Sequence, residues 1–424
     1  MTSPDATPAT REGILSSLGP GLALAATGVG AGDLLAALVA GATFGEVLGW
    51  AIALGALLKL ALNEALARWQ LATDTTLLEG WCAHLGRPFQ VVLVAYLTVW
   101  TFVVAGGLMA ACGAAAHAVW PVVGIPVWGA IHSMAAAALV LAGRYAVFEH
   151  VMKALVGVMV ATLIASVGLV GIDLCAALRG LLLPLLPAGS AATVVGVMGG
   201  VGGSVTMLAY GYWIREHGWS GPRMLPTVRR DLAVGYLLTG VFGVAMLLVA
   251  ATVLLGAVPE GSGALTACGN AIRDGASTRF GPATGALARA LFLAGVWAAV
   301  ATSMLGVWQG VPYLCADLLR NLRGRMGGGI DTRGVAYRAV LAWLAVPPMV
   351  LLVIERPMWV VRLYTTTSGL FMPLLAGSLL WLGRRRDLMG GLRLGAASTA
   401  ALAASLVLFG VLAVRQIADV VFVR

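Results

Sequence analysis

The chain has 424 residues, of which 60% are hydrophobic and only 11% are charged, and its mean hydropathy is +0.94. Soluble domains carry about 25% charged residues, so this composition excludes an ordinary soluble protein and predicts an integral membrane protein. The formal net charge is +9. The basic residues lie in short segments between apolar runs, which indicates membrane topology and argues against nucleic-acid binding. The expected partner is therefore the lipid bilayer.

Runs of about 20 apolar residues are long enough to cross a bilayer as a helix, and eleven such runs follow one another in the chain. They cover 18–43, 46–70, 89–117, 122–142, 149–176, 191–214, 231–257, 283–312, 336–354, 359–382 and 394–421. Runs of this length leave no room for barrel strands, so we expect an all-α integral membrane protein. The five cysteines are scattered and form no C-x-x-C pair, which predicts neither a disulfide framework nor a zinc site.

The distribution of basic residues predicts the orientation of these spans. Eighteen Lys and Arg residues fall on the side of the N-terminus and eight on the opposite side, with Lys59 left inside a span. The positive-inside rule places the N-terminus in the cytoplasm and, after eleven spans, the C-terminus outside. The polar segment 1–17 lacks the basic start and short apolar core of a signal peptide, so we expect a retained cytoplasmic tail. The expected location is the plasma (inner) membrane.

Two of the runs are interrupted by glycines. The first contains "ATGVGAGDLL", in which Gly28, Gly30 and Gly32 precede Asp33, and the sixth contains "VMGGVGGSV". Glycine is about 1 kcal/mol worse than alanine inside a helix, and a carboxylate at membrane depth costs a few kcal/mol more. Unwound backbone at this depth is tolerated only where it lines a cavity. Broken segments at matching positions of two halves predict an inverted-repeat transporter with a mid-membrane site, although either segment alone is also compatible with close helix packing.

Three stretches near the N-terminus resemble the Nramp (natural resistance-associated macrophage protein) family of proton-coupled divalent-metal transporters. They are "GPG" at 19–21, "AGATFG" at 40–45 and "LARWQLATDTTLLEGW" at 66–81, with a fainter match at 299–310, "AVATSMLGVWQG". The resemblance implies a LeuT-type fold with two inverted repeats of five helices, in which helices 1 and 6 are unwound at mid-membrane. It places the first repeat at 18–178, the second at 190–383 and one additional span at 394–424.

The metal-binding motifs of that family are altered in this chain. Where the family has Asp-Pro-Gly-Asn, the chain has Gly30-Ala31-Gly32-Asp33, and where the family has Met-Pro-His it has Met207-Leu208-Ala209. Carried over residue by residue, the resemblance implies a divergent site formed by Asp33 and Met207. The carbonyls of Thr27 and Ser204 lie one turn earlier, and Gly30 stands at the place of the missing aspartate. Span three has no carboxylate, so the family's acidic proton route is absent there.

We therefore expect a monomeric secondary transporter, not an enzyme, because the glycines at 28–32 precede no nucleotide-binding β-α unit. The resemblance implies import of a divalent cation such as manganese or iron by proton symport, without a cofactor. The soft sulfur of Met207 favours such ions over calcium and magnesium. The alternative is a small organic solute, an amino acid or an organic acid, on the same scaffold, which Tyr210 could bind through its hydroxyl.

Further polar residues inside the spans are secondary candidates. Asp33 and Glu64 are candidates for proton coupling, since Glu64 could replace the missing acids of span three. Lys59 and Asn63 are four residues apart and share a helix face, and a structural ion pair would explain Lys59. The residues expected beside the site, in support of its ligands, are Lys59, Asn63, Gln309 and Thr366.

Overall fold

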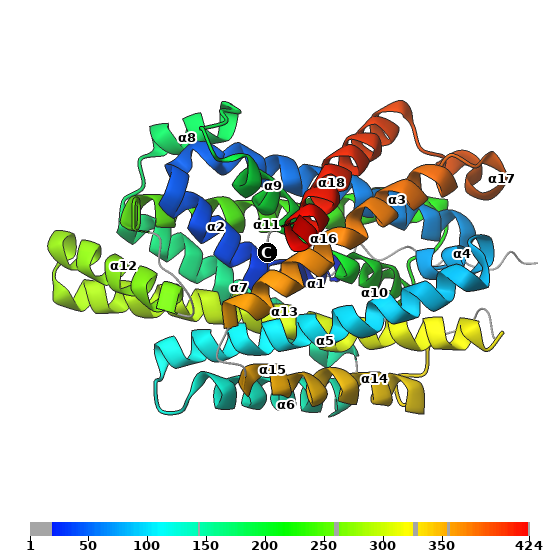
Figure 1. Cartoon of the computed structure of the whole chain (residues 1–424), viewed down its shortest axis with the longest axis horizontal. Coiled ribbons are helices and arrows are strands. Elements are labelled where there is room, and N and C mark those ends of the chain that lie inside the picture. Colours follow the sequence, from blue (N-terminus) through cyan, green and yellow to red (C-terminus); the bar gives the residue numbers. More distant parts are fainter. Residues whose placement is uncertain (1–18, 143–144, 258–262, 325–329, 354–356, 423–424) are drawn as a thin grey trace, which may run out of the picture.

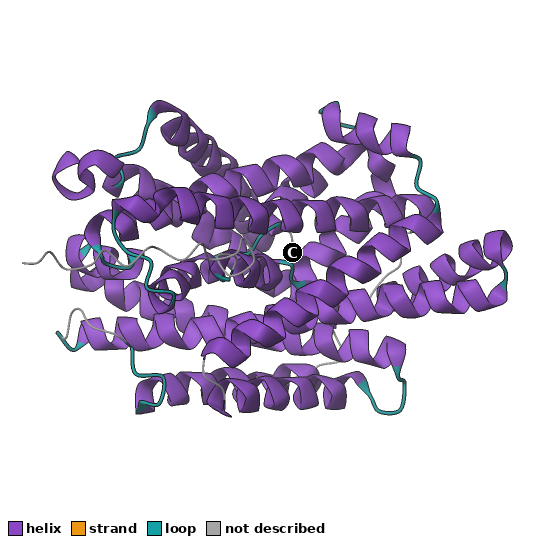
Figure 2. Cartoon of the chain, turned by 180° about the vertical axis from the view of Figure 1, so that it is seen from behind, coloured by secondary structure: helices purple, strands orange, loops and turns teal. Residues whose placement is uncertain are grey.

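The computed structural model describes residues 19–142, 145–257, 263–324, 330–353 and 357–422, and every element in these ranges is a helix. The expected tail, 1–17, lies outside the described residues. Figure 2 shows long helices packed side by side and joined by short loops. This arrangement confirms the predicted all-α class.

The helices fall into two groups. Those that form the apolar segments are α1 (Pro20–Gly28), α2 (Ala31–Phe44), α3 (Gly49–Thr73), α5 (Gly86–Val119), α6 (Ile125–Ala142), α7 (Tyr145–Val170), α9 (Ala191–Gly200), α10 (Ala209–Glu216), α11 (Leu225–Val253), α13 (Pro282–Leu322), α14 (Val335–Ala345), α15 (Val350–Val353), α16 (Pro357–Leu382) and α18 (Ala396–Phe422). Shorter or more polar elements connect them: α4 (Leu77–His84), α8 (Leu174–Leu182), α12 (Ala264–Phe280), α17 (Arg386–Met389) and the 3-10 turns η1 (Gly45–Leu48), η2 (Val205–Leu208), η3 (Pro222–Met224), η5 (Pro347–Met349) and η6 (Gly390–Leu392).

All eleven predicted spans fall on helices of the first group, and three of them, 18–43, 191–214 and 336–354, are each divided between two helices. Within the described residues, nine segments are long and apolar enough to cross a membrane, and Thr367–Leu382 is a shorter apolar helix. The first of the nine, Gly32–Thr73, contains parts of two predicted spans, which the η1 turn separates. Helix α13 runs ten residues beyond the predicted end at 312, because its last turns are polar but buried against neighbouring helices. The stretch 264–280, which lies between two predicted spans, forms α12.

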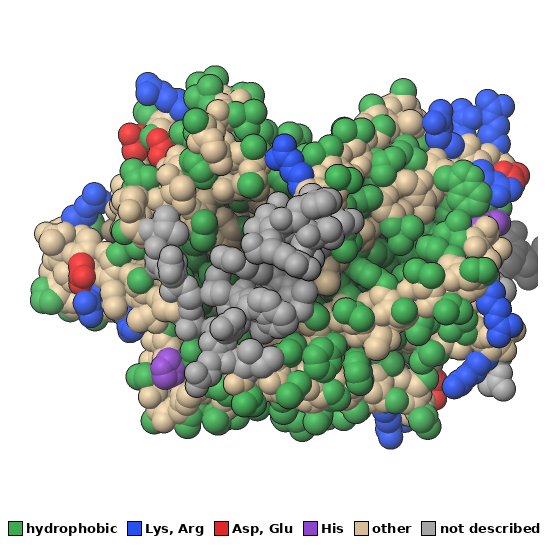
Figure 3. All heavy atoms as spheres, viewed as in Figure 1, with side chains coloured by type: hydrophobic (Ala, Val, Ile, Leu, Met, Phe, Trp, Pro, Cys, Tyr) green, Lys and Arg blue, Asp and Glu red, His purple; other side chains and the backbone are tan. Residues whose placement is uncertain are grey.

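Charged side chains gather at the two ends of the long helices. In Figure 1 the long helices run horizontally, with α8 and α12 toward one end and α4 and α17 at the other. Figure 3 shows a broad hydrophobic band between these ends, with most of the visible Lys and Arg side chains beside α17 and α4. An apolar belt flanked by charged ends is the arrangement that a bilayer requires.

The two interrupted segments cross at the centre of the molecule. Helix α11 packs along α2 and α3, and α13 packs against α7 and α5, so that long unbroken helices surround the short ones. At the crossing point, a Cβ atom added to Gly28 would lie 2.9 Å from the backbone carbon of Gly202. Only glycines allow the two breaks to approach this closely. The fold therefore brings the glycine-rich stretches at 28–32 and 199–203 into direct contact.

Candidate functional site between the two broken helices

The first break separates α1 from α2 at Val29 and Gly30. The Val29 N–H still donates to the carbonyl of Ala25 at 3.0 Å, and Gly30 then adopts an extended conformation with φ −92° and ψ 178°. The carboxylate Oδ2 of Asp33 accepts the Gly30 N–H at 3.2 Å and so caps the start of α2. The N-terminus of a helix stabilises a negative charge. The break thus places the Asp33 carboxylate in the first turn of α2, where the helix stabilises its negative charge.

The second break is longer and depends on glycine. Helix α9 ends at Gly200, and Gly202 and Gly203 adopt φ +84° and +78°, a left-handed region that other residues rarely enter. The chain resumes helical structure in η2, where the Met207 N–H donates to the carbonyl of Ser204 at 3.0 Å. Because α9 ends here, the carbonyl groups of Gly199, Gly200 and Gly203 have no N–H donor from a following helical turn and need other donors.

Lys59 supplies those donors. This residue of α3 is fully buried, and its ammonium donates to the carbonyl of Gly199 at 2.8 Å, to that of Gly200 at 3.4 Å and to that of Gly203. A lysine ammonium has three N–H bonds and no acceptor, so three carbonyls satisfy it. Its positive charge also interacts with Asp33. The residue that the sequence analysis placed beside the site therefore lies inside it.

A very small cavity adjoins Asp33. It has a volume of about 10 Å³ and is lined by Val29, Asp33, Leu34, Ala37, Val201, Thr239, Phe242, Gly243 and Met246. The opposite oxygen of the carboxylate, Oδ1, faces Gly200, where an added Cβ would be 3.1 Å away. About 10–15 Å³ is what one water molecule needs. In this conformation the space beside the carboxylate fits an object no larger than a water molecule or a single ion.

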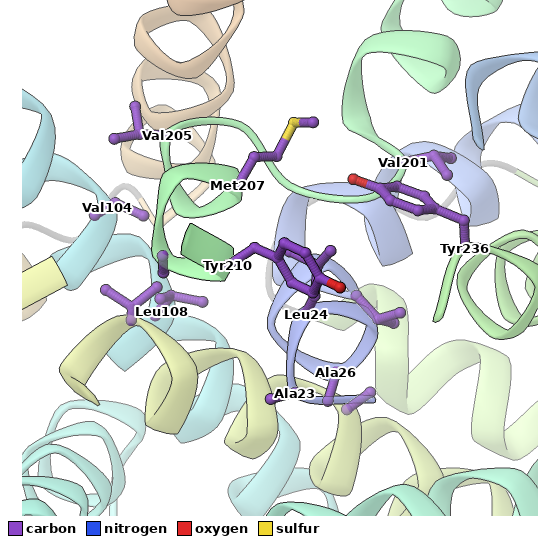
Figure 4. Close-up of a cluster of buried hydrophobic side chains, with 14 of the residues drawn as sticks. Ala23, Leu24, Ala26, Val104, Leu108, Val201, Val205, Met207, Tyr210 and Tyr236 are labelled. Atoms are coloured by element: carbon purple, nitrogen blue, oxygen red, sulfur yellow. The ribbon is translucent and has the colours of Figure 1, made fainter. Parts of the chain in front are cut away.

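The remaining predicted ligands lie around the breaks, with part of their bonding capacity already used. Met207 is fully buried in η2, and Figure 4 shows it together with Tyr210 and Leu24. The Thr27 hydroxyl donates to the carbonyl of Ala23 at 2.6 Å, and the Thr27 carbonyl accepts the hydroxyl of Ser303 at 2.9 Å. Carbonyl oxygens have two lone pairs, so the carbonyls of Thr27 and Ser204 each keep one acceptor site.

Two other predicted residues, Tyr210 of the sixth span and Gln309 of the eighth, bond away from the breaks. The Tyr210 hydroxyl donates to Asp231 Oδ2 at 2.9 Å, which ties α10 to α11. The side-chain oxygen of Gln309 accepts the indole N–H of Trp213 at 2.5 Å. Both side chains therefore help to position α10.

The predicted polar residues of α3 divide between the site and the surface. Asn63, one turn after Lys59, donates from its amide nitrogen to the hydroxyl of Tyr236 at 3.3 Å. Glu64 lies nearer the end of the molecule that carries α4, where its carboxylate accepts from Arg68 at 2.7 Å and from Arg229 at 2.8 Å. The side chain of Thr366 lies outside the described part of α16.

The structure also contains buried polar residues that the sequence analysis did not select. Thr302 and Ser303 of α13 donate to the carbonyls of Ala26 and Thr27 and so hold the end of α1. Asp317 is fully buried near α4 and α10. Its spacing in "CADLLRNL" places Asp317 and Asn321 four residues apart on one helix face, which was a usable signal for a buried polar cluster.

The donor set at the breaks is one of oxygen and sulfur atoms. Within the described residues, no group of three or more His, Cys, Asp and Glu side chains comes together as a metal site. A cation beside Asp33 would therefore have that carboxylate as its one acidic neighbour in the described part of the chain. Unwound helices with such groups at their crossing define a helical membrane transporter.

The comparisons with known proteins agree with this class and give the family. The model of the Nramp family, described as natural resistance-associated macrophage protein-like, matches residues 21–419. The chain therefore belongs to the Nramp family, and it is a membrane transporter, not an enzyme. No curated protein matches the chain.

Solved structures share the fold at low sequence identity. A mutant of the manganese transporter of Eremococcus coleocola is 15% identical, has a TM-score of 0.76 and aligns over 98% of this chain and 90% of its own. MhsT in complex with L-phenylalanine is 15% identical with a TM-score of 0.58, over 94% of this chain and 97% of its own. Mhp1, a nucleobase-cation-symport-1 family transporter, is 13% identical with a TM-score of 0.53, over 95% and 93%. The predicted LeuT-type fold is confirmed.

Proposed function

We propose that the protein moves a divalent cation, manganese or iron, across the membrane through a site between the two broken helices. The observation that carries the proposal is the Asp33 carboxylate beside a cavity of about 10 Å³ at the crossing of the breaks. Membership of the Nramp family supports it, as does the fold shared with a protein described as a manganese transporter.

The proposed ligands are Asp33, the Met207 sulfur and backbone carbonyls of Thr27, Ser204 and the glycine-rich stretch at 199–203. Oxygen ligands alone suit magnesium and calcium, whereas a thioether adds preference for softer ions. The cavity size argues against the organic-solute alternative, because even a small amino acid needs several times the space that this conformation provides. Tyr210, the residue proposed to bind an organic solute, donates its hydroxyl to Asp231 instead.

Uptake into liposomes tests the proposal directly. Purified protein reconstituted into liposomes is expected to accumulate Mn²⁺ faster than protein-free liposomes. Because we propose proton symport, an inward proton gradient is expected to accelerate this uptake. Asp33 is the proposed proton carrier, because Glu64 is engaged by two arginines. No accumulation of Mn²⁺ or Fe²⁺, combined with thermal stabilisation of the protein by amino acids or organic acids alone, would favour the organic-solute alternative and overturn the proposal.

We also propose that the N-terminus is cytoplasmic, in the plasma membrane, and cysteine labelling tests this orientation. Cys175 is exposed in α8, which follows the fifth span. A membrane-impermeant maleimide added to intact cells is therefore expected to label the protein, and the Cys175→Ser variant is expected to stay unlabelled. Cys82 of α4 serves as an internal negative control, because burial, with the nearby charges of Asp317 and Glu79, raises its pKa to about 12. Labelling that appears only after the cells are opened contradicts the proposed orientation.

A further inference from the structure

We propose that Lys59 is a built-in competitor of the transported cation: its ammonium occupies the carbonyl oxygens of the second break and leaves them when a cation binds. The inference rests on the proposed function, because it concerns the same site. It assigns to Lys59 a role in setting affinity, beyond that of a structural ion pair.

The position of the ammonium supports this assignment. Lys59 lies in α3 and its acceptors lie at the end of α9, so an unbroken helix reaches into the break of another. Buried carbonyls at membrane depth need a positive or polar partner, and the ammonium is the partner they have in this conformation. A metal ion seeks the same oxygens, since carbonyls are good ligands for hard and borderline cations. The two cations therefore compete for one set of atoms.

The charges point the same way. Asp33 contributes one negative charge and Lys59 one positive charge, and the two interact. When both charges are present, the net charge of the site is close to zero. The site without a bound cation is then less costly in free energy in a poorly solvated interior. A divalent cation entering beside an unmoved ammonium would leave two uncompensated positive charges. Binding is therefore easier when the ammonium withdraws.

Asn63 offers a place to which the ammonium can withdraw. Its side-chain oxygen Oδ1 is buried and has no hydrogen-bond partner in the part of the chain that the structure describes. Asn63 follows Lys59 by one helical turn on the same face, and helical side chains lean back toward the preceding turn. The Tyr236 hydroxyl, which the Asn63 amide nitrogen contacts at 3.3 Å, lies beside it. The inference therefore assigns this unused oxygen to Lys59 as a second acceptor, besides the glycine carbonyls that its ammonium contacts.

The central experiment measures Mn²⁺ affinity of purified protein by calorimetry. The Lys59→Met variant keeps the length of the side chain and removes its charge, and we expect it to bind Mn²⁺ at least about tenfold more tightly than wild type. The chain has a second lysine, Lys153, which pairs with Glu149 at 2.6 Å away from the breaks. The Lys153→Met variant removes the same charge there and is expected to leave the affinity unchanged. Equal or weaker Mn²⁺ binding by folded Lys59→Met overturns the inference.

A second pair of measurements separates competition from bracing of the fold. The Lys59→Ala variant leaves space for a free ammonium, so we expect millimolar methylammonium to reduce its Mn²⁺ affinity competitively and to raise its thermal stability. Asn63→Leu removes the proposed resting place, so it is expected to weaken Mn²⁺ binding in wild type but not in the Lys59→Met background, a coupling that a double-mutant cycle isolates. Absence of both effects would mean that Lys59 only braces the break.

The outcomes distinguish this inference from the proposed function. If neither wild type nor Lys59→Met binds Mn²⁺ or Fe²⁺, the proposed function fails. If wild type binds Mn²⁺ and Lys59→Met does not bind it more tightly, the inference alone fails. If Mn²⁺ binds only after Lys59 is replaced, the competitor role stands and metal transport by the wild-type protein is overturned.

Discussion

Replacing Asp33 by asparagine is expected to abolish Mn²⁺ uptake while leaving the fold intact. The substitution removes the carboxylate at the breaks but keeps an oxygen that can accept the Gly30 N–H, so α2 keeps its cap. The site then carries the uncompensated charge of Lys59 and repels a cation. Removing the one carboxylate that faces the bound cation is therefore expected to weaken Mn²⁺ binding by about a hundredfold, roughly 3 kcal/mol. Liposome uptake measures the loss of transport, and calorimetry measures the loss of Mn²⁺ affinity.

Asp173 provides the matched control for this experiment. Its carboxylate caps α8 by accepting the N–H of Cys175 at 2.8 Å, in an exposed position far from the breaks. Asp173→Asn therefore makes the same chemical change at another helix N-terminus, and uptake is expected to stay at the wild-type level. Asp33→Asn protein that elutes as a single species and transports Mn²⁺ normally would remove the main support for the metal site.

The second large effect is expected at Asp317, in stability. This carboxylate is fully buried and accepts hydrogen bonds from Tyr212 at 2.7 Å, Arg320 at 2.7 Å, Asn321 at 3.1 Å and Thr76 at 3.3 Å. It joins the start of α4, helix α10 and the end of α13. Asp317→Ala leaves a buried positive charge with less compensation and several donors without their acceptor, a change that costs about 3–5 kcal/mol.

The loss is expected as a fall of several degrees in the apparent melting temperature of the detergent-solubilised protein. The control is Asp387→Ala, which removes a carboxylate that pairs with Arg385 at 2.6 Å on an exposed surface. Exposed ion pairs contribute little, so this variant is expected to melt with wild type. Similar melting temperatures for the two variants would show that the buried cluster does not stabilise the packing of α10.

The sequence predicted the helical spans and the two breaks because both depend on local properties. Apolar length defines a span, and a cluster such as Gly199 to Gly203 disrupts a helix wherever it lies. The predicted span ended too early in α13, because the last turns of this helix contain polar residues. These turns are nevertheless buried by neighbouring helices, which local composition does not reveal. Local composition therefore predicts the scaffold and misses polar segments that other helices cover.

The partner of each polar side chain was harder to predict. Helical spacing showed that Lys59 and Asn63 share a face, but it could not show that this face meets the carbonyls of α9, 140 residues away. The same limit applies to Tyr210, whose sequence neighbours suggest a place at the break while its hydroxyl bonds to Asp231 on α11. Asp33 could be predicted as a site residue because a carboxylate beside a helix break at membrane depth is rare, whatever its neighbours in space are.

The close approach of Gly28 to Gly202 has a mechanical consequence. At this crossing, the end of α1 and the loop after α9 touch through backbone atoms, with no side chain between them. Interlocked side chains would have to change rotamer before one segment could slide over the other. Bare main chain imposes no such barrier, so we expect the two segments to slide past each other at this contact without a change of rotamer.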